Sequence, residues 1–497
     1  MIIELFTPEL DGQRVTFRWR IDPAPELYRR QEFSFNFPET LDLGRIPLSL
    51  WWRIALICLH SHWPLFRPCQ VRLPIRLLPG EAECWSRLLE VQAMTLEASY
   101  GTKSLSRRIE ILEEGPELPI VPLPDSPRCV TAFSGGKDSL LQVGLLTELA
   151  PQTILVTTTS PMPPLEDHVT ERRREVFDEI GRRREVTFVE VESDFRGNYN
   201  YYQPPSLENY VPATTIHDTL LYLGSSLAAG YALGAPHLFL ASEVEVNENR
   251  EVDGQIIQHP HYMYSVLTQG AIERILAPFG IRYCSLTSPL RSYQVQELLW
   301  TRYRDLCDLQ YSCWQTRRGE KMCNTCSQCL RVALCALATG GRPSRMGADW
   351  VKLLSALDDW TPKPMARLAG ETRPQEISSI HLHSQVARYL ERLDWPVIAR
   401  EIWRDSILNL WRREAWRAIG SYRGLRRRAM ATDPGPSPGY QPGFLRFVDP
   451  LIREELAAIY AASYRPADGE EAFANADRAE KWLAWITAPL HRQETGN

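Results

Sequence analysis

Residues 134–139 read SGGKDS, between a short apolar run at 128–133 and a helix-forming run at 140–150. Two adjacent glycines let a backbone turn sharply and approach an anion closely. A helix that begins just after such a turn offers free N–H groups and the positive end of its dipole. The order strand, glycine turn and helix therefore predicts a phosphate-binding loop at the carboxyl end of a strand, where open α/β sheets bind ligands.

The polar side chains of this loop suit a nucleotide triphosphate, because the serines add hydroxyl donors, the lysine adds a cation and the aspartate can hold Mg²⁺. The expected ATP-binding residues are Ser134, Gly135, Gly136, Lys137, Asp138 and Ser139, and the last three are the expected catalytic residues. The alternative is a plain glycine turn with Ser and Asp as helix caps. That alternative does not require two glycines, a lysine and two serines together. The spacing differs from GxxxxGK[ST] and GxGxxG.

Strands alternate with helices on the carboxyl side of the loop, which predicts an α/β fold with a doubly wound, parallel five-stranded sheet. The expected strands are residues 128–133, 153–159, 186–191, 237–241 and 282–286. The expected helices are residues 140–150, 169–184, 215–234, 262–279 and 293–307.

The length of 497 residues exceeds one ordinary domain. We expect an N-terminal α+β accessory domain over residues 1–127, a catalytic domain over 128–342 and a C-terminal helical domain over 343–497. The proline-containing stretch 117–127 separates the first two.

Composition narrows the class of protein. The formal net charge of -5 argues against nucleic acid as the main partner. The first residues lack a basic segment followed by an apolar core, so we expect no secretory signal and a cytoplasmic protein. Residues 220–241 contain no Asp, Glu, Lys or Arg, and we interpret them as a buried helix followed by a buried strand, not as a membrane span.

A cysteine cluster follows the last expected strand. Its spacing, C-x9-C-x2-C-x2-C, lets four thiolates surround Zn²⁺, and the expected ligands are Cys313, Cys323, Cys326 and Cys329. The alternatives are redox-active cysteines, an iron–sulfur cluster or plain core cysteines. We expect the remaining cysteines to lie in the core: Cys58, Cys69, Cys84, Cys129, Cys284, Cys307 and Cys335.

The SGGKDS loop resembles the SGGxDS loop of the PP-loop ATP pyrophosphatase superfamily, whose members adenylate a substrate and release pyrophosphate. Residues 287–290 (TSPL), Cys313-Trp314 and the pattern C-x2-C-x2-C-x-R make the chain similar to 7-cyano-7-deazaguanine synthases over about residues 128–341. The resemblance implies ATP, Mg²⁺ and a structural Zn²⁺. It also implies that ATP adenylates the carboxylate of 7-carboxy-7-deazaguanine.

The chain departs from these synthases by a long segment on each side of the shared region. It thereby resembles the enlarged synthase-like proteins of bacterial antiviral defence operons, some of which join a deazaguanine to the amino terminus of a protein. We therefore expect an ATP-dependent ligase that passes the activated carboxylate to a protein amino group or to ammonia. Three alternatives stay open: a free-standing synthase, a tRNA-modifying thiolase, and a binding protein on a degenerate fold. The oligomeric state is open.

Substrate-binding candidates follow the loop along the chain. Residues 210–215 resemble a VPxRN stretch that lies near ATP in the synthases, although Thr214 and Thr215 replace its Arg-Asn pair and would serve equally as helix caps. His217 begins the same expected helix. Glu243 and Asn247 follow the fourth strand at its carboxyl end, where they would read a polar substrate edge or place Mg²⁺; an exposed polar loop is the alternative.

Two basic runs lie outside these motifs. Residues 171–174 (ERRR) and 182–184 (RRR) are interleaved with acidic residues, which favours a solvated helix face. Arg423 and residues 426–428 (RRR) lack acidic neighbours, and docking of a partner or of RNA there is a weaker alternative.

Overall fold

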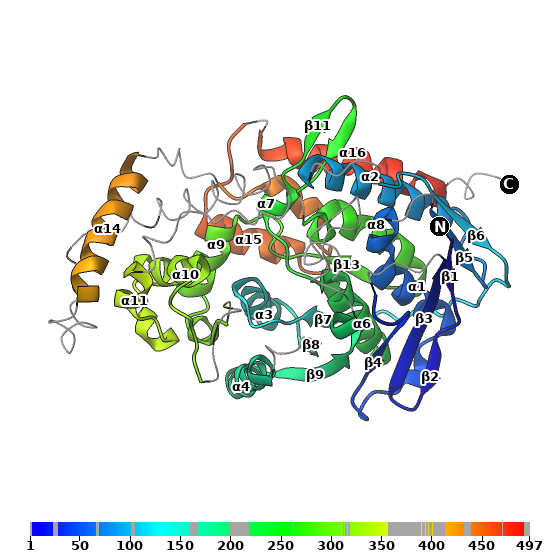
Figure 1. Ribbon diagram of the computed structural model, residues 1–497, viewed down its shortest axis with the longest axis horizontal. Coiled ribbons are helices and arrows are strands. Elements are labelled where there is room, and N and C mark those ends of the chain that lie inside the picture. Colours follow the sequence, from blue (N-terminus) through cyan, green and yellow to red (C-terminus); the bar gives the residue numbers. More distant parts are fainter. Residues whose placement is uncertain are drawn as a thin grey trace.

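The computed structural model describes residues 2–22, 28–65, 69–100, 105–159, 167–198, 218–259, 261–311, 313, 316, 319–355, 389, 393, 396, 400, 413–431, 439–469 and 471–491. Within these residues a mixed, mostly parallel sheet of eleven strands runs through the molecule (Figure 1). Its order is β13 (Arg282–Cys284), β10 (His237–Phe239), β7 (Arg128–Ala132), β8 (Gln152–Thr159), β9 (Val186–Ser193), β4 (Glu32–Asn36), β3 (Arg14–Asp22), β1 (Ile2–Leu5), β5 (Cys69–Leu73) and β6 (Ile109–Glu113), with β2 (Glu9–Asp11) paired to β3.

The five strands expected from the sequence are all present, and β13, β10, β7, β8 and β9 pair in parallel. The sheet does not end there, because β4 pairs antiparallel with β9, with Phe35 opposite Ser193 and Asn36 opposite Glu192. The expected sheet of five strands was therefore too small, because six strands from residues 2–113 extend it. The limits 1–127, 128–342 and 343–497 stay a prediction.

Helices cover both faces of the parallel part. Adjacent strand residues point to opposite faces, and Cys129 and Val130 of β7 accordingly belong to different hydrophobic clusters, as do Leu155 and Val156 of β8. One face packs on α1 (Leu48–Leu59) and α6 (Asp218–Ala232). The other packs on α3 (Lys137–Leu149), α4 (Asp167–Arg183) and α9 (Ser292–Thr301). Burial on both faces is nearly complete for β7, β8 and β10, although β8 carries four threonines, whereas several residues of β9 are partly or fully exposed.

The remaining elements surround this frame. They are α2 (Glu81–Tyr100), α5 (Phe195–Asn198), α7 (Val244–Asn247), β11 (Arg250–Val252), β12 (Gln255–Ile257), α8 (Val266–Leu276), α10 (Ser327–Ala338), α11 (Trp350–Ser355), α14 (Arg413–Ala431), α15 (Arg453–Ser463) and α16 (Glu471–His491). The late helix α16 lies beside α2 and α8 (Figure 1). On α15, the Tyr460 hydroxyl donates to the Leu286 carbonyl at 2.7 Å, just beyond β13. The last segment of the chain therefore packs against the sheet layers.

The apolar stretch at residues 220–241 forms the buried helix α6 and the buried strand β10, as expected. Among the described helices, none combines the length and the apolar character needed to cross a bilayer. The seven cysteines expected in the core are all buried.

Candidate functional site

The glycine turn lies directly beyond β7 and leads into α3. Gly135 has φ 81°, a left-handed conformation that favours glycine. Gly136 is the N-cap of α3, with φ -74° and ψ 171°, and makes no side-chain cap bond. The hydroxyls of Ser134 and Ser139 lie 3.4 Å apart, and the Ser139 hydroxyl donates to the Gly136 carbonyl at 3.1 Å. The turn thus leaves a helix N-terminus without a side-chain cap at the carboxyl end of a central strand, which is an anion-binding arrangement.

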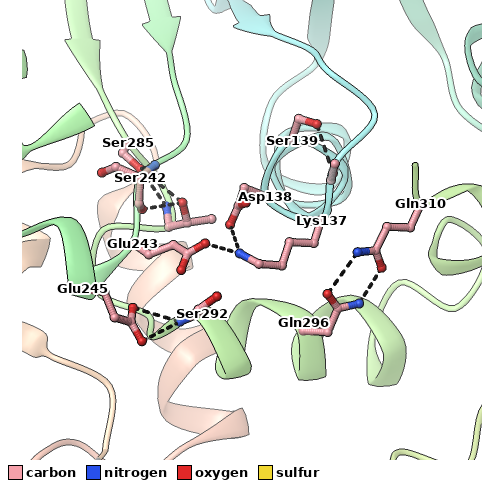
Figure 2. A network of polar contacts seen from close by, with 12 residues as sticks. Lys137, Asp138, Ser139, Ser242, Glu243, Glu245, Ser285, Ser292, Gln296 and Gln310 are labelled. Atoms are coloured by element: carbon pink, nitrogen blue, oxygen red, sulfur yellow. Dashed lines mark hydrogen bonds and ion pairs between the residues drawn. The ribbon is translucent and has the colours of Figure 1, made fainter. Parts of the chain in front are cut away.

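Lys137 lies between two carboxylates (Figure 2). Its Nζ is 2.6 Å from Asp138 Oδ1 and also pairs with Glu243, which follows β10. The lysine is only 5% exposed, so its charge is neutralised within the protein and not by water. Sequence analysis selected all three residues, but only the fold shows that Glu243 meets the first turn of α3.

The two carboxyls differ in proton affinity. Although burial alone raises the pKa of Glu243, Lys137 and hydrogen bonds to Asp138 and Ser292 lower it to about 2. Burial and the Glu243 charge raise the pKa of Asp138 to about 7, against the opposing effect of Lys137. A pair of neighbouring carboxyls with separated pKa values is typical of sites that move protons or bind cations.

Further charged side chains lie beyond Glu243, away from the glycine turn, and form a row with Lys137 and Asp138. Both oxygens of the Glu245 carboxylate accept from the Ser292 N–H, at 3.1 and 3.0 Å, at the start of α9. Burial and the neighbouring Glu243 raise the pKa of Glu245 to about 7. Arg291 pairs with Glu248 at 2.8 Å. Carboxylates outnumber cations in this row, so a polyphosphate would need added positive charge to lie beside it.

Asn247 occupies a different kind of position. Its Nδ2 donates to the Glu243 carbonyl at 2.9 Å, and its Oδ1 accepts from the Val266 N–H at 2.7 Å. At 2% exposure it fastens α7 to the start of α8. Its predicted contact with substrate stays a prediction, and the amide already has structural partners. Thr214, Thr215 and His217 lie outside the described residues.

The sequence did not assign a role in the site to Ser242 or Ser285, and it gave Thr287 only as part of the TSPL stretch at residues 287–290. Ser285 Oγ accepts from the Ser242 N–H at 2.7 Å, and Thr287 Oγ1 donates to the Ser242 carbonyl at 2.6 Å. These bonds join the carboxyl ends of β10 and β13 (Figure 2). Ser242 Oγ is buried and has no hydrogen-bond partner among the described residues. Runs of Ser and Thr directly after buried strands were the available signal.

The four expected cysteines converge. Their Sγ atoms all lie within 4.8 Å of one another, and the separations Cys313–Cys326, Cys323–Cys329 and Cys326–Cys329 are 3.8, 3.8 and 3.5 Å. Zinc–sulfur bonds of about 2.3 Å in a tetrahedron place sulfurs about 3.8 Å apart. The cluster could therefore hold a metal ion such as zinc.

The surroundings of the cluster also suit a metal. The Thr325 N–H donates to Cys323 Sγ at 3.5 Å, and Asn324 adopts φ 59°, which turns the knuckle. Hydrogen bonding to Cys313 and Cys326, with burial, raises the pKa of the Cys329 thiol. The Cys329 thiol therefore resists ionisation by itself, and a bound cation would reverse this.

Comparison of the chain with family models, with curated proteins and with solved structures gave no match.

Proposed function

We propose that the chain is an ATP-dependent ligase that adenylates a carboxylate and transfers the acyl group to an amine. One observation carries the proposal: an uncapped helix N-terminus behind a left-handed glycine turn lies beside the Lys137–Asp138–Glu243 cluster. The turn offers N–H groups and hydroxyls to a polyphosphate. The cluster offers one movable cation and two carboxylates for a divalent ion.

In this proposal the phosphates of ATP lie on Ser134–Ser139, and Lys137 turns from Glu243 towards them. The substrate carboxylate attacks the α-phosphorus, the bond to the β-phosphate oxygen breaks, and pyrophosphate leaves. The amine then attacks the acyl carbon and AMP leaves. Asp138 and Glu243 would hold Mg²⁺, which would supply neutralising positive charge. Positioning and electrostatic stabilisation provide most of the rate.

The proposed carboxylate is 7-carboxy-7-deazaguanine, on the resemblance of the glycine loop and the cysteine cluster to the synthases. The proposed acceptor is a protein amino group or ammonia, and the proposed setting is bacterial antiviral defence. On the same resemblance, the proposed role of Zn²⁺ is structural, and the four thiols that could hold it are Cys313, Cys323, Cys326 and Cys329. A tRNA thiolase of the same superfamily is less favoured, because the net charge of -5 does not suit RNA binding.

The test is product analysis by mass spectrometry. The full chain is incubated with ATP, Mg²⁺ and 7-carboxy-7-deazaguanine, with either ammonia or a candidate protein encoded beside it. We expect AMP, pyrophosphate and a deazaguanine amide, nitrile or protein conjugate. Asp138→Asn and Ser139→Ala should lower pyrophosphate release by about 100-fold or more. The control Thr147→Ala, at the far end of α3, should stay near the wild-type rate. Equal rates in all four proteins would contradict the proposal.

A further inference from the structure

Arg173 is a buried arginine with no counter-ion among the residues that the structure describes. It lies on α4 and is 6% exposed. Its Nη1 donates to the Thr158 carbonyl at 3.3 Å, and its Nε has no hydrogen-bond partner among the described residues. No carboxylate in the described part of the chain forms an ion pair with it. Buried charges in proteins are almost always paired, since an unpaired one destabilises the fold.

Both neighbouring arginines, unlike Arg173, form ion pairs with carboxylates among the described residues. Arg174 is 56% exposed on its side chain and pairs with Glu190 at 2.7 Å, and Arg172 pairs with Glu175 at 2.6 Å. The interpretation of this run as a solvated helix face is therefore right for Arg174 and wrong for Arg173. Helical spacing turns successive residues by about 100°, so Arg173 faces inward while Arg174 faces water. Arg172 is intermediate: its side chain is 17% exposed, and its Nε is buried without a hydrogen-bond partner among the described residues.

The Thr158 carbonyl, which accepts the hydrogen bond from Arg173, lies level with the start of the glycine turn. In the parallel pair β7–β8, Ala132 is opposite Val156. Two residues beyond Ala132, Ser134 begins the turn. Two residues beyond Val156, Thr158 supplies the carbonyl that accepts from Arg173. Neighbouring strands lie about 4.8 Å apart. The guanidinium is therefore held one strand away from the phosphate loop, at the same edge of the sheet.

A second unsatisfied polar atom lies on the same face. Thr158 Oγ1 contacts Ser225 Oγ of α6 at 2.5 Å. Because successive strand residues alternate, Thr157 points to the opposite face, which α3 and α4 cover. Thr157 Oγ1 is buried and has no hydrogen-bond partner among the described residues. An inward hydroxyl and an inward guanidinium thus share one end of β8.

Tyr311 connects this place with the glycine turn. Its N–H donates to the Gly135 carbonyl at 2.7 Å. The Tyr311 hydroxyl contacts Thr316 Oγ1 at 2.8 Å. The charges of Arg173 and Arg172 act on this hydroxyl, so the residue that contacts the turn lies within electrostatic reach of both arginines.

We propose that Arg173 and Thr157 form an oxyanion subsite beside the glycine turn, which binds either a phosphate group of the nucleotide or the carboxylate of the co-substrate. The role of the ligand in catalysis rests on the proposed function; binding of the oxyanion itself does not. Guanidinium groups bind phosphate and carboxylate with paired N–H donors, and a buried one does so with little competition from water.

The test uses the full chain and isothermal titration with inorganic pyrophosphate, ATP and 7-carboxy-7-deazaguanine in turn. Arg173→Met should weaken binding of at least one of these at least tenfold. The matched control Arg174→Gln, one residue along the same helix, should bind all three within twofold of wild type. Loss confined to pyrophosphate and ATP assigns the phosphate source, and loss confined to the deazaguanine assigns the carboxylate source.

Thermal unfolding separates a binding role from a structural one. Since Arg173→Met removes a buried charge that has no ion-pair partner in the described part of the chain, the free protein should melt at the wild-type temperature or above it, while the melting-point rise caused by the anion is lost. A lower melting temperature with unchanged anion affinity would overturn the subsite. If no pyrophosphate is released from ATP, yet anion binding still depends on Arg173, the proposed function fails and the subsite stands.

Discussion

The backbone N–H of Tyr311 donates to the carbonyl of Gly135 at 2.7 Å, and Cys313 follows two residues later. The glycine turn is thereby fastened to the chain that enters the cysteine cluster. A metal that fixes Cys313 would also restrain Tyr311, because only one residue separates them along the chain. Through Tyr311 it would restrain the glycine turn.

Loss of the metal should therefore weaken nucleotide binding. Cys323→Ser should release the metal, measured by elemental analysis, and should lower ATP affinity at least tenfold in isothermal titration. In the control Cys307→Ala, which changes a buried cysteine outside the cluster, the metal should be retained. Wild-type ATP affinity in metal-free protein that still shows a cooperative melt would refute the coupling.

The two glycines of the turn should differ in their tolerance of alanine. Gly135→Ala places a side chain at φ 81°, which costs about 1–2 kcal/mol in unfolding free energy. Gly136→Ala keeps φ -74° and should cost less than about 1 kcal/mol. At either position the added Cβ would meet its nearest atom at 3.6 or 3.5 Å, so steric clash does not explain the difference. Urea denaturation measures both values, and equal losses would contradict the argument.

Asp138 should make the free protein less stable as the pH rises. Its pKa is raised from 3.8 to about 7, so the folded chain holds a proton that the unfolded chain releases near pH 4. This contribution is complete below about pH 4 and is lost as the pH rises through 7. The slope should be below about 1.4 kcal/mol per pH unit, since the side chain is 33% exposed. Urea titrations at pH 5, 6 and 7 measure the decrease in unfolding free energy, which should be smaller in Asp138→Asn than in the wild type. The same decrease in both proteins would exclude Asp138 as its cause.

A buried ion pair between α1 and α2 should contribute more to stability than an exposed ion pair does. Arg53 and Glu81 are 2% and 0% exposed and lie 2.5 Å apart, and Glu81 also accepts from the Leu78 N–H at 3.0 Å. Glu81→Ala leaves the buried guanidinium of Arg53 without its ion-pair partner and should lower the free energy of unfolding by about 3–5 kcal/mol. The control Glu4→Ala breaks an exposed pair with Arg20 and should cost at most about 1 kcal/mol. Chemical denaturation compares them, and similar losses would contradict the prediction.

Local features were predictable from the sequence. The five parallel strands, the glycine turn and the cysteine quartet depend on residues that are near neighbours along the chain. The helix α2 escaped notice, because its twenty residues carry no clear start or stop signal beyond an acidic first turn. The extension of the sheet through β4 also escaped notice, because an edge strand does not specify its partner by its own pattern.

What the sequence by itself determined is the chemistry available: a phosphate-type turn, four thiols at metal spacing and carboxylates after strand ends. Only the tertiary structure decided that Glu243, 106 residues from Lys137, is its ion-pair partner, and that Arg173 faces inward while Arg174 faces water. The physical reason is that the spacing of residues along a helix or strand indicates which side chains share a face. Whether those side chains are buried, and which partners they meet, depends on the elements that pack against that face.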